Sequence, residues 1–194
     1  YREFVVVTLS LSYVLSFLDR RLLSVLIQPI KATLGLSDVQ IGMLTGTAFA
    51  VFYTIFGIPV AMLADRRNRV RIVSVACAVW SVFSMASGLA TNFLTLALAR
   101  IGVGIGEAGG SPPSYSIISD YFPPERRGRA LATYSLGVPV GSLLGVAAGA
   151  GIAAHFGWRA AFLSVGAVGL LLAPVIVFVV REPRRREDME RGRP

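Results

Sequence analysis

Residues 39–90 decide the fold. They read VQIGMLTGTAFAVFYTIFGIPVAMLA, then DRRNRVR, then IVSVACAVWSVFSMASGLA. The first and third runs, 39–64 and 72–90, are long enough to cross a bilayer as helices, which takes about 20 apolar residues. The polar run between them, 65–71, contains four arginines. Two apolar helices joined by a short basic loop are typical of a protein that crosses a membrane more than once.

The rest of the chain repeats this pattern. The apolar blocks are 4–18, 39–64, 72–90, 93–118, 130–154 and 160–180. Charged residues make up only 15% of the chain, against roughly a quarter in soluble domains. We therefore predict an all-α membrane protein, a six-transmembrane-helix bundle over residues 1–183. Residues 184–194 are expected to begin a cytoplasmic linker.

The net charge of +8 could suggest binding to nucleic acid, because basic surfaces attract phosphate. Its distribution argues against this. Thirteen of the 19 cationic residues follow the second, fourth and sixth blocks, and basic loops stay in the cytoplasm. We therefore expect no nucleic-acid partner, a multi-pass membrane protein, and both ends of the segment in the cytoplasm. The preference for arginine over lysine favours a bacterial inner membrane.

Charged residues lie deep in two of the predicted helices: Asp19 and Arg20 in the first, Arg100 and Glu107 in the fourth. At about 1.5 Å per residue, Arg20 and Arg100 lie at similar depth, so Asp19 can meet Arg100. Glu107 lies two turns beyond Arg100 on the same face. Charges inside a membrane are costly and are usually paired and functional. Arg21 points about 100° away from Arg20 and is expected either to extend toward the membrane surface or to face another helix.

Two interpretations of these charges stay open. A carboxylate flanked by arginines can be neutralised by a proton or by a cation, which suits proton coupling through Asp19 and Glu107. Arg20 and Arg100 would then pair with the carboxylates or with an anionic substrate. Alternatively, the four groups form a structural network that only fixes two helices together.

Glycine and proline residues mark two candidate hinges. Pro112 and Pro113, preceded by Gly109, remove backbone donors and predict a bend in the fourth helix, either a hinge or a fixed kink. A glycine stripe in the fifth helix predicts close helix packing, either static or as a sliding surface. The stripe consists of Gly137, Gly141, Gly145 and Gly149.

No pattern in the chain predicts an enzyme, a cofactor or a metal site. The run GIGEAG at 104–109 matches a dinucleotide-binding pattern, but such a site needs a preceding strand. Here the run lies inside a predicted membrane helix. We therefore expect no dinucleotide to bind there.

Residues 61–71 resemble the signature loop of the major facilitator superfamily, Gly-x-Leu-Ala-Asp-Arg-x-Gly-Arg-Lys. They depart from it at Ala61, Asn68 and Val70. The resemblance implies the N-terminal half of a 12-helix major facilitator fold, whose C-terminal six-helix half is missing here. It also implies that Asp65 helps to latch a cytoplasmic gate. Arg66, Arg69 and Asp120 would complete this gate, unless these residues are ordinary interface charges.

Within the superfamily, the chain is similar to the spinster-like branch. The resemblance rests on Asp19-Arg20, on Arg100 followed by GIGEA at 104–108, and on GWRAAF at 157–162 and REP at 181–183. It implies a lipid-like substrate of the sphingolipid or lysophospholipid type and dependence on protons.

The sequence thus predicts a secondary active transporter that works by alternating access. Its first and fourth helices would line the path, and its third and sixth would face lipid. The expected partners are membrane lipid, a small amphipathic substrate, protons and the missing half. One alternative is a proton-coupled symporter or antiporter of a small organic anion or drug. Another is a membrane scaffold or receptor that transports nothing.

Overall fold

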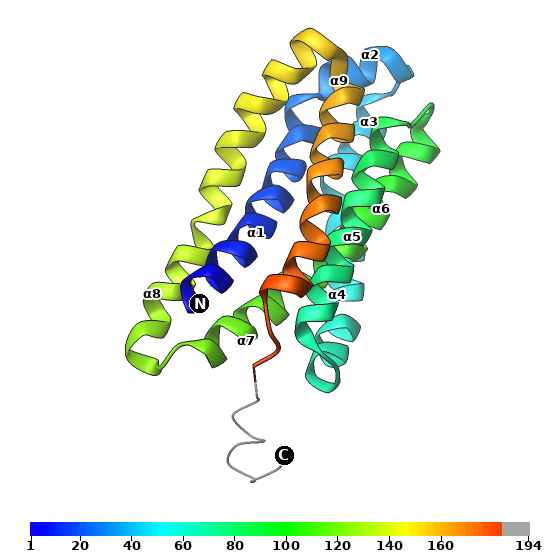
Figure 1. Cartoon of the computed structure of the whole chain (residues 1–194). Helices are drawn as coiled ribbons and strands as arrows, with labels where there is room; N and C mark the ends of the chain where they lie inside the picture. Colours follow the sequence, from blue (N-terminus) through cyan, green and yellow to red (C-terminus); the bar gives the residue numbers. More distant parts are fainter. Residues whose placement is uncertain (184–194) are drawn as a thin grey trace.

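The computed structural model describes residues 1–183, apart from the side chains of residues 47–50, 61 and 65. All of the described elements are helical, which confirms the all-α prediction (Figure 1). In chain order they are α1 (Arg2–Val25), α2 (Ile27–Leu34), α3 (Asp38–Gly42), the π-helical turn η1 (Met43–Thr47), α4 (Ala48–Arg66), α5 (Arg69–Gly88), α6 (Phe93–Ala108), α7 (Ser111–Tyr121), α8 (Pro124–Ser135) and α9 (Gly137–Val179).

These elements form the six predicted crossings. Among the described residues, four helical stretches are long and apolar enough to cross a membrane: Asp38–Ala64, Arg69–Gly88, Phe93–Tyr121 and Pro124–Val179. The last has 56 residues, which at about 1.5 Å per residue far exceeds a hydrocarbon core of about 30 Å. A sharp turn divides it into two crossings. The sixth crossing is α1, which has 24 residues and carries the intramembrane charges.

Gly157 makes the turn inside α9. Its φ of 81° and ψ of 163° are accessible to glycine and strained for other residues. The two arms of α9 run antiparallel on either side of α1, the first coloured yellow and the second orange (Figure 1). We call the end of the bundle that contains Gly157 the far end. The opposite end, which carries residues 66–71 and 123–129, is the arginine-rich end.

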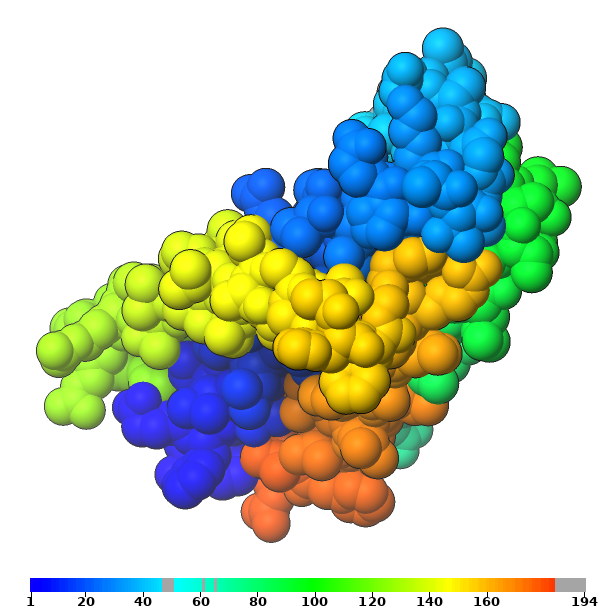
Figure 2. All heavy atoms as spheres, turned by 90° about the horizontal axis from the view of Figure 1, so that it is seen from above, coloured from blue at the N-terminus to red at the C-terminus, as the bar shows by residue number. Residues whose placement is uncertain are grey.

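Side-chain contacts tie three segments together at the far end. Trp158 Nε1 donates to Thr33 Oγ1 at 3.3 Å, which joins α9 to α2. Arg159 Nη2 donates to the carbonyl oxygen of Ala90 at 2.8 Å, just after α5. Seen from this end, α2 in light blue lies against the turn of α9 (Figure 2).

Side-chain caps explain where several helices begin. Ser37 and Gln40 form a capping box at the start of α3, and Asn92 and Thr95 form another at the start of α6. The side chain of Asn68 accepts from the backbone nitrogen of Arg71 at 2.8 Å, at the start of α5. Each cap satisfies backbone donors that the first turn leaves free.

The glycine stripe packs the first arm of α9 directly onto α1. A Cβ atom added to Gly141 would lie 2.3 Å from the carbonyl oxygen of Val14, and one added to Gly145 would lie 2.8 Å from that of Leu18. Both distances are shorter than atoms can approach without a shift. The predicted close packing is therefore confirmed, and sliding along this surface stays a prediction.

The core consists of two apolar clusters, one toward each end of the bundle. Val103 and Tyr134 belong to the cluster at the arginine-rich end. Leu96 and Phe162 belong to the cluster at the far end. Arg100 lies on α6 between Leu96 and Val103, so the buried charges sit where the two clusters meet.

Candidate functional site: two crossed ion pairs and a terminal charge cluster

The first ion pair joins α1 to α6. Arg100 Nη2 donates to Asp19 Oδ2 at 2.8 Å, and Asp19 and Arg100 are 0% and 2% exposed. The hydroxyl of Ser84, on α5, donates to the other oxygen of Asp19. Three helices thus converge on one buried carboxylate. The contact with Arg100 was expected from the sequence. The contact with Ser84 was not, because the third crossing was expected to face lipid.

The second ion pair joins the same two helices closer to the arginine-rich end. Arg20 Nε lies 2.6 Å from Glu107 Oε2, where the glutamate side chain is fully buried and the arginine side chain is 28% exposed. Arg20 follows Asp19 by one position and so points about 100° away from it. Asp19 and Arg20, adjacent on α1, therefore bind Arg100 and Glu107, which lie two turns apart on α6.

This arrangement differs in one respect from the expectation from sequence, in which one carboxylate is flanked by both arginines. In the structure each arginine binds its own carboxylate, because consecutive residues on a helix cannot face the same point. All four predicted residues are nevertheless brought together in one network.

Some polar atoms of this network have no hydrogen-bond partner within the described part of the chain. They are Nε and Nη1 of Arg100 and Oε1 of Glu107. A buried polar atom without a partner is costly. The Arg100 guanidinium and the Glu107 carboxylate therefore retain unused capacity to bind an anion and a proton, respectively.

A cavity of about 250 Å³ opens beside these pairs. Its lining is Phe17, Arg20, Arg21, Leu23, Ser24, Leu44, Thr45 and Arg100. Arg21 also donates to Ser142 Oγ on α9 at 3.3 Å, so it faces another helix, which is one of the two expected arrangements. The cavity combines three guanidinium groups with apolar walls, which suits an anionic group attached to an apolar body.

The π-helical turn η1 contributes to this cavity, and the sequence analysis missed it. Leu44 and Thr45 both belong to η1 and line the cavity. Insertions of this kind are frequent at functional sites, because they re-aim side chains within a long helix. The only sequence signal was the pair of glycines, Gly42 and Gly46, that flank these residues.

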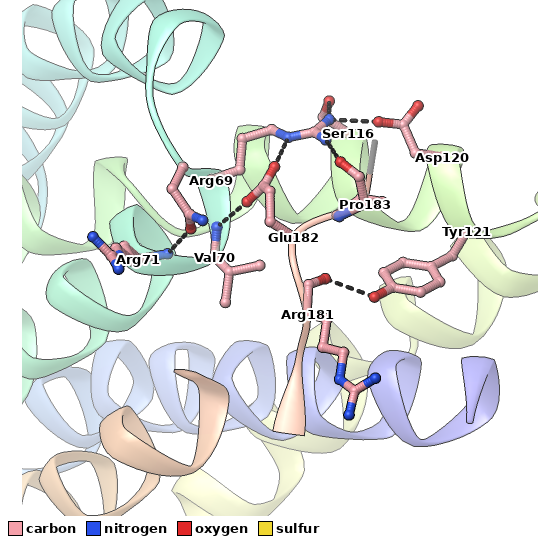
Figure 3. Close-up of polar contacts among 10 residues, drawn as sticks. Arg69, Val70, Arg71, Ser116, Asp120, Tyr121, Arg181, Glu182 and Pro183 are labelled. Atoms are coloured by element: carbon pink, nitrogen blue, oxygen red, sulfur yellow. Dashed lines mark hydrogen bonds and ion pairs between the residues drawn. The ribbon is translucent and has the colours of Figure 1, made fainter. Parts of the chain in front are cut away.

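Charged residues also gather at the arginine-rich end, around Arg69 (Figure 3). Arg69 is 4% exposed, and its guanidinium contacts Asp120 on α7 at 2.6 Å and Glu182 after α9 at 2.7 Å. It also donates to Ser116 Oγ at 2.7 Å. The second oxygen of Glu182 accepts from the backbone nitrogen of Val70 at 2.9 Å. One arginine thus joins three crossings.

This cluster contains only part of the predicted gate. Arg69 and Asp120 are in contact, whereas Arg66 is exposed and no contact among the described residues joins it to Arg69. The side chain of Asp65 lies outside the described part of the structure. Glu182 was missed as a member, although it stands in the REP run that the sequence analysis quoted only for its resemblance.

The predicted bend in the fourth crossing is a break between two helices. α6 ends at Ala108, and α7 begins at Ser111 with a proline in its first turn, where no backbone donor is missed. Gly109 serves close packing, because an added Cβ would lie 2.8 Å from Ala76 Cβ on α5. Whether Gly109, Pro112 and Pro113 act as a hinge stays a prediction, as it does for Gly137 and Gly141.

Together these features define a membrane helical bundle with a buried polar site and a charge cluster at one end. A family model of the Major Facilitator Superfamily matches residues 9–194. The chain belongs to this superfamily, as its signature loop predicted. Members of this superfamily are transporters rather than enzymes, in agreement with the expectation that the chain is not an enzyme.

Comparisons with individual proteins support the same family. An "MFS-type efflux pump" of Mycolicibacterium smegmatis is 39% identical over 172 residues, covering 89% of this chain and 40% of the relative. A "Probable L-galactonate transporter" of Escherichia coli is 34% identical over 160 residues, covering 82% of this chain and 35% of the relative.

A solved structure shows the spinster-like character of the chain. The crystal structure of a bacterial homologue of the human lysosomal transporter spinster, inward-facing and unoccupied, superposes with a TM-score of 0.87 and 42% identity. The match covers 95% of this chain and 44% of that one. The chain therefore spans less than half the length of these three proteins and corresponds to the N-terminal half of the fold.

Proposed function

We propose that the full-length protein is a proton-coupled secondary transporter that works by alternating access. The observation that carries this proposal is the pair of crossed ion contacts, Asp19 with Arg100 and Arg20 with Glu107, beside a cationic cavity. Protonation of either carboxylate weakens its hold on an arginine. The released guanidinium can then bind an anionic substrate, which links proton binding to substrate binding.

We propose an amphipathic, lipid-like substrate with an anionic group, of the sphingolipid phosphate or lysophospholipid type. The apolar side chains of Phe17, Leu23 and Leu44 in the cavity wall suit an acyl chain. The guanidinium groups of Arg20 and Arg100 suit a phosphate. The likeness to a bacterial spinster homologue supports this choice.

The second candidate is a symporter or antiporter of a small organic anion. The two nitrogens of Arg100 without a hydrogen-bond partner in the described part of the chain favour it, because a compact carboxylate could accept a charge-assisted hydrogen bond from one of them. The similarity to a probable L-galactonate transporter supports it as well. A membrane scaffold or receptor that transports nothing is the candidate from a different class.

A single transport assay distinguishes these candidates. The full-length protein is reconstituted in liposomes and given a lysophospholipid or galactonate, with and without a pH gradient. We expect lysophospholipid movement that accelerates with the gradient and is lost in Arg100→Gln. Movement of galactonate alone would select the small-anion candidate. No movement of either probe would contradict both transport proposals and favour a scaffold.

We further propose that the arginine-rich end faces the cytoplasm of a bacterial cell. Basic residues between crossings are retained on that side. The orientation is tested by placing single cysteines at Arg126 and at Thr91 in a Cys77→Ser background. Impermeant maleimide should label only position 91 from outside the inner membrane. Labelling of position 126 would reverse the topology.

A further inference from the structure

An apolar groove runs along the bundle between α4, α5 and α6, and the transport site does not use it. Its volume is about 560 Å³, within the range of roughly 300–1,000 Å³ typical of ligand pockets. Apolar side chains form its walls: Val60, Leu63, Ile72, Val75, Val79 and Ile105. None of its lining residues lines the cavity beside Arg20 and Arg100.

Two glycines at the floor of the groove, Gly106 in α6 and Gly109 just after it, lie tight against α5 and add no side chain of their own to the groove. A Cβ added to Gly106 would lie 2.5 Å from the backbone nitrogen of Trp80, and one added to Gly109 would lie 2.8 Å from Ala76 Cβ. Gly106, Gly109 and Ala76 all line the groove. An unbranched hydrocarbon chain fits such a surface better than a helix with side chains.

The groove is basic at one end only. Arg67 and Arg71 line it at the arginine-rich end, next to Asn68. Arg71 is exposed, and its side chain points away from the Arg69 and Glu182 pair (Figure 3). Arg71 therefore takes no part in the charge cluster, and its guanidinium is available at the mouth of the groove.

We propose that this groove binds an anionic phospholipid from the leaflet at the arginine-rich end. Its phosphate would lie against Arg71 and Arg67, and an acyl chain would lie along Val75 and Ile105. Basic residues at the end of an apolar groove between membrane helices are complementary to such a lipid in both charge and polarity. This site is distinct from the transport pathway and does not rest on the proposed function.

Native mass spectrometry of the full-length protein tests the proposal. Detergent-solubilised protein is mixed with equal amounts of dioleoyl phosphatidylglycerol and dioleoyl phosphatidylcholine. We expect preferential retention of phosphatidylglycerol. Each arginine near an anionic headgroup contributes about fivefold in affinity. Arg71→Gln should therefore reduce the preference about fivefold, and Arg67→Gln with Arg71→Gln should remove it.

Matched variants separate the groove from general surface charge. Arg126→Gln with Arg129→Gln removes two arginines at the same end that line a different cavity, and it should keep the preference. Val75→Phe fills the groove and should lower retention several-fold. Val82→Phe alters another exposed residue of α5 outside the groove, and it should behave like the parent.

Three results would overturn the proposal. The first is equal retention of both lipids by the parent. The second is an equal loss of preference in the Arg126 and Arg129 variant, which would indicate nonspecific attraction. The third is full retention by Val75→Phe, which would place the lipid elsewhere or show that the missing half covers the groove.

Discussion

Asp19 binds Arg100 with a separation of 2.8 Å between Oδ2 and Nη2, and neither side chain reaches the surface of the bundle. The pair is therefore shielded from water, and each charge is stabilised mainly by the opposite charge of its partner. Removing one partner of a buried ion pair typically costs about 3–5 kcal/mol, because the remaining charge stays uncompensated. The first two predictions follow from this dependence.

Arg100→Ala should lower the stability of the full-length protein by about 3–5 kcal/mol, whereas Arg100→Ala combined with Asp19→Asn should recover much of that loss. The double variant leaves no unpaired carboxylate at Asp19. Thermal unfolding in detergent, followed by intrinsic fluorescence, measures both. Equal loss in the single and double variants would show that Arg100 acts through its contact with Phe162, whose ring centroid lies 5.7 Å from Arg100 Cζ, rather than through its pairing with Asp19.

Asp19→Asn should still fold, with lower stability because Arg100 loses its counter-charge, and it should lose the pH dependence of transport. The amide keeps the size of the carboxylate and the hydrogen bond from Ser84, but it cannot take up a proton. Ser84→Ala, which removes one hydrogen bond worth about 1 kcal/mol, serves as the control and should keep the pH profile. The measurement is the transport rate across a pH series. If Asp19→Asn kept both the rate and the profile of the parent, the proton would have to bind elsewhere.

Glu182→Gln should loosen the arginine-rich end, because Arg69 and the backbone nitrogen of Val70 both lose a charged acceptor. We expect faster maleimide labelling of a cysteine introduced at Ser116, in a Cys77→Ser background. Asp120→Asn should act in the same direction, and Asp65→Ala is predicted to do so if Asp65 belongs to the gate. Glu125→Gln, on the same side but outside the cluster, is the control. An unchanged labelling rate in the Glu182 variant would show that the cluster around Arg69 does not hold this end of the bundle closed.

Gly141→Ala should destabilise the bundle by about 1–3 kcal/mol, because the new methyl group meets the backbone of Val14. Gly151→Ala is the matched control on the same arm of α9, where an added Cβ meets nothing within 4 Å. That change should be neutral or slightly stabilising, since alanine favours helix. Unfolding temperatures of both variants decide the matter. Similar values would mean that α1 and α9 can move apart at no cost.

A protein that consists of residues 1–183 alone should not transport substrate. The cavity beside Arg20, Arg21 and Arg100 has walls only from this half, and charged groups exposed to lipid are costly. We expect the isolated segment to self-associate or to need its other half, as measured by size-exclusion chromatography and uptake in liposomes. Substrate uptake by a monomeric segment would refute this.

Much of this architecture could be predicted from sequence because membrane helices are long and apolar. The six crossings follow from block length, and the Asp19 contact with Arg100 follows from equal depth on two helices. Partner choice was harder to predict. Arg20 pairs with Glu107 because of the direction in which its side chain leaves the axis of α1. The depth of a residue in the membrane does not predict that direction.

Other residues were missed because their signals are weak or nonlocal. Ser84 is one of several serines on α5, and nothing in the sequence indicates which of them faces α1. Thr45 lines the cavity from the π-helical turn η1, which the sequence marks only with the flanking glycines Gly42 and Gly46. Glu182 meets Arg69 across 113 positions of the chain, a contact that depends on where the second arm of α9 ends.

The ties at the far end have a consequence for motion. Trp158 and Arg159 fasten the turn of α9 to α2 and to the segment after α5, so three segments share one anchored corner. At the other end, α5, α7 and the segment after α9 are held together by ionic contacts around Arg69. If the full-length protein works by alternating access, as we propose, we expect the far end to move least in each transport cycle and the arginine-rich end to move most.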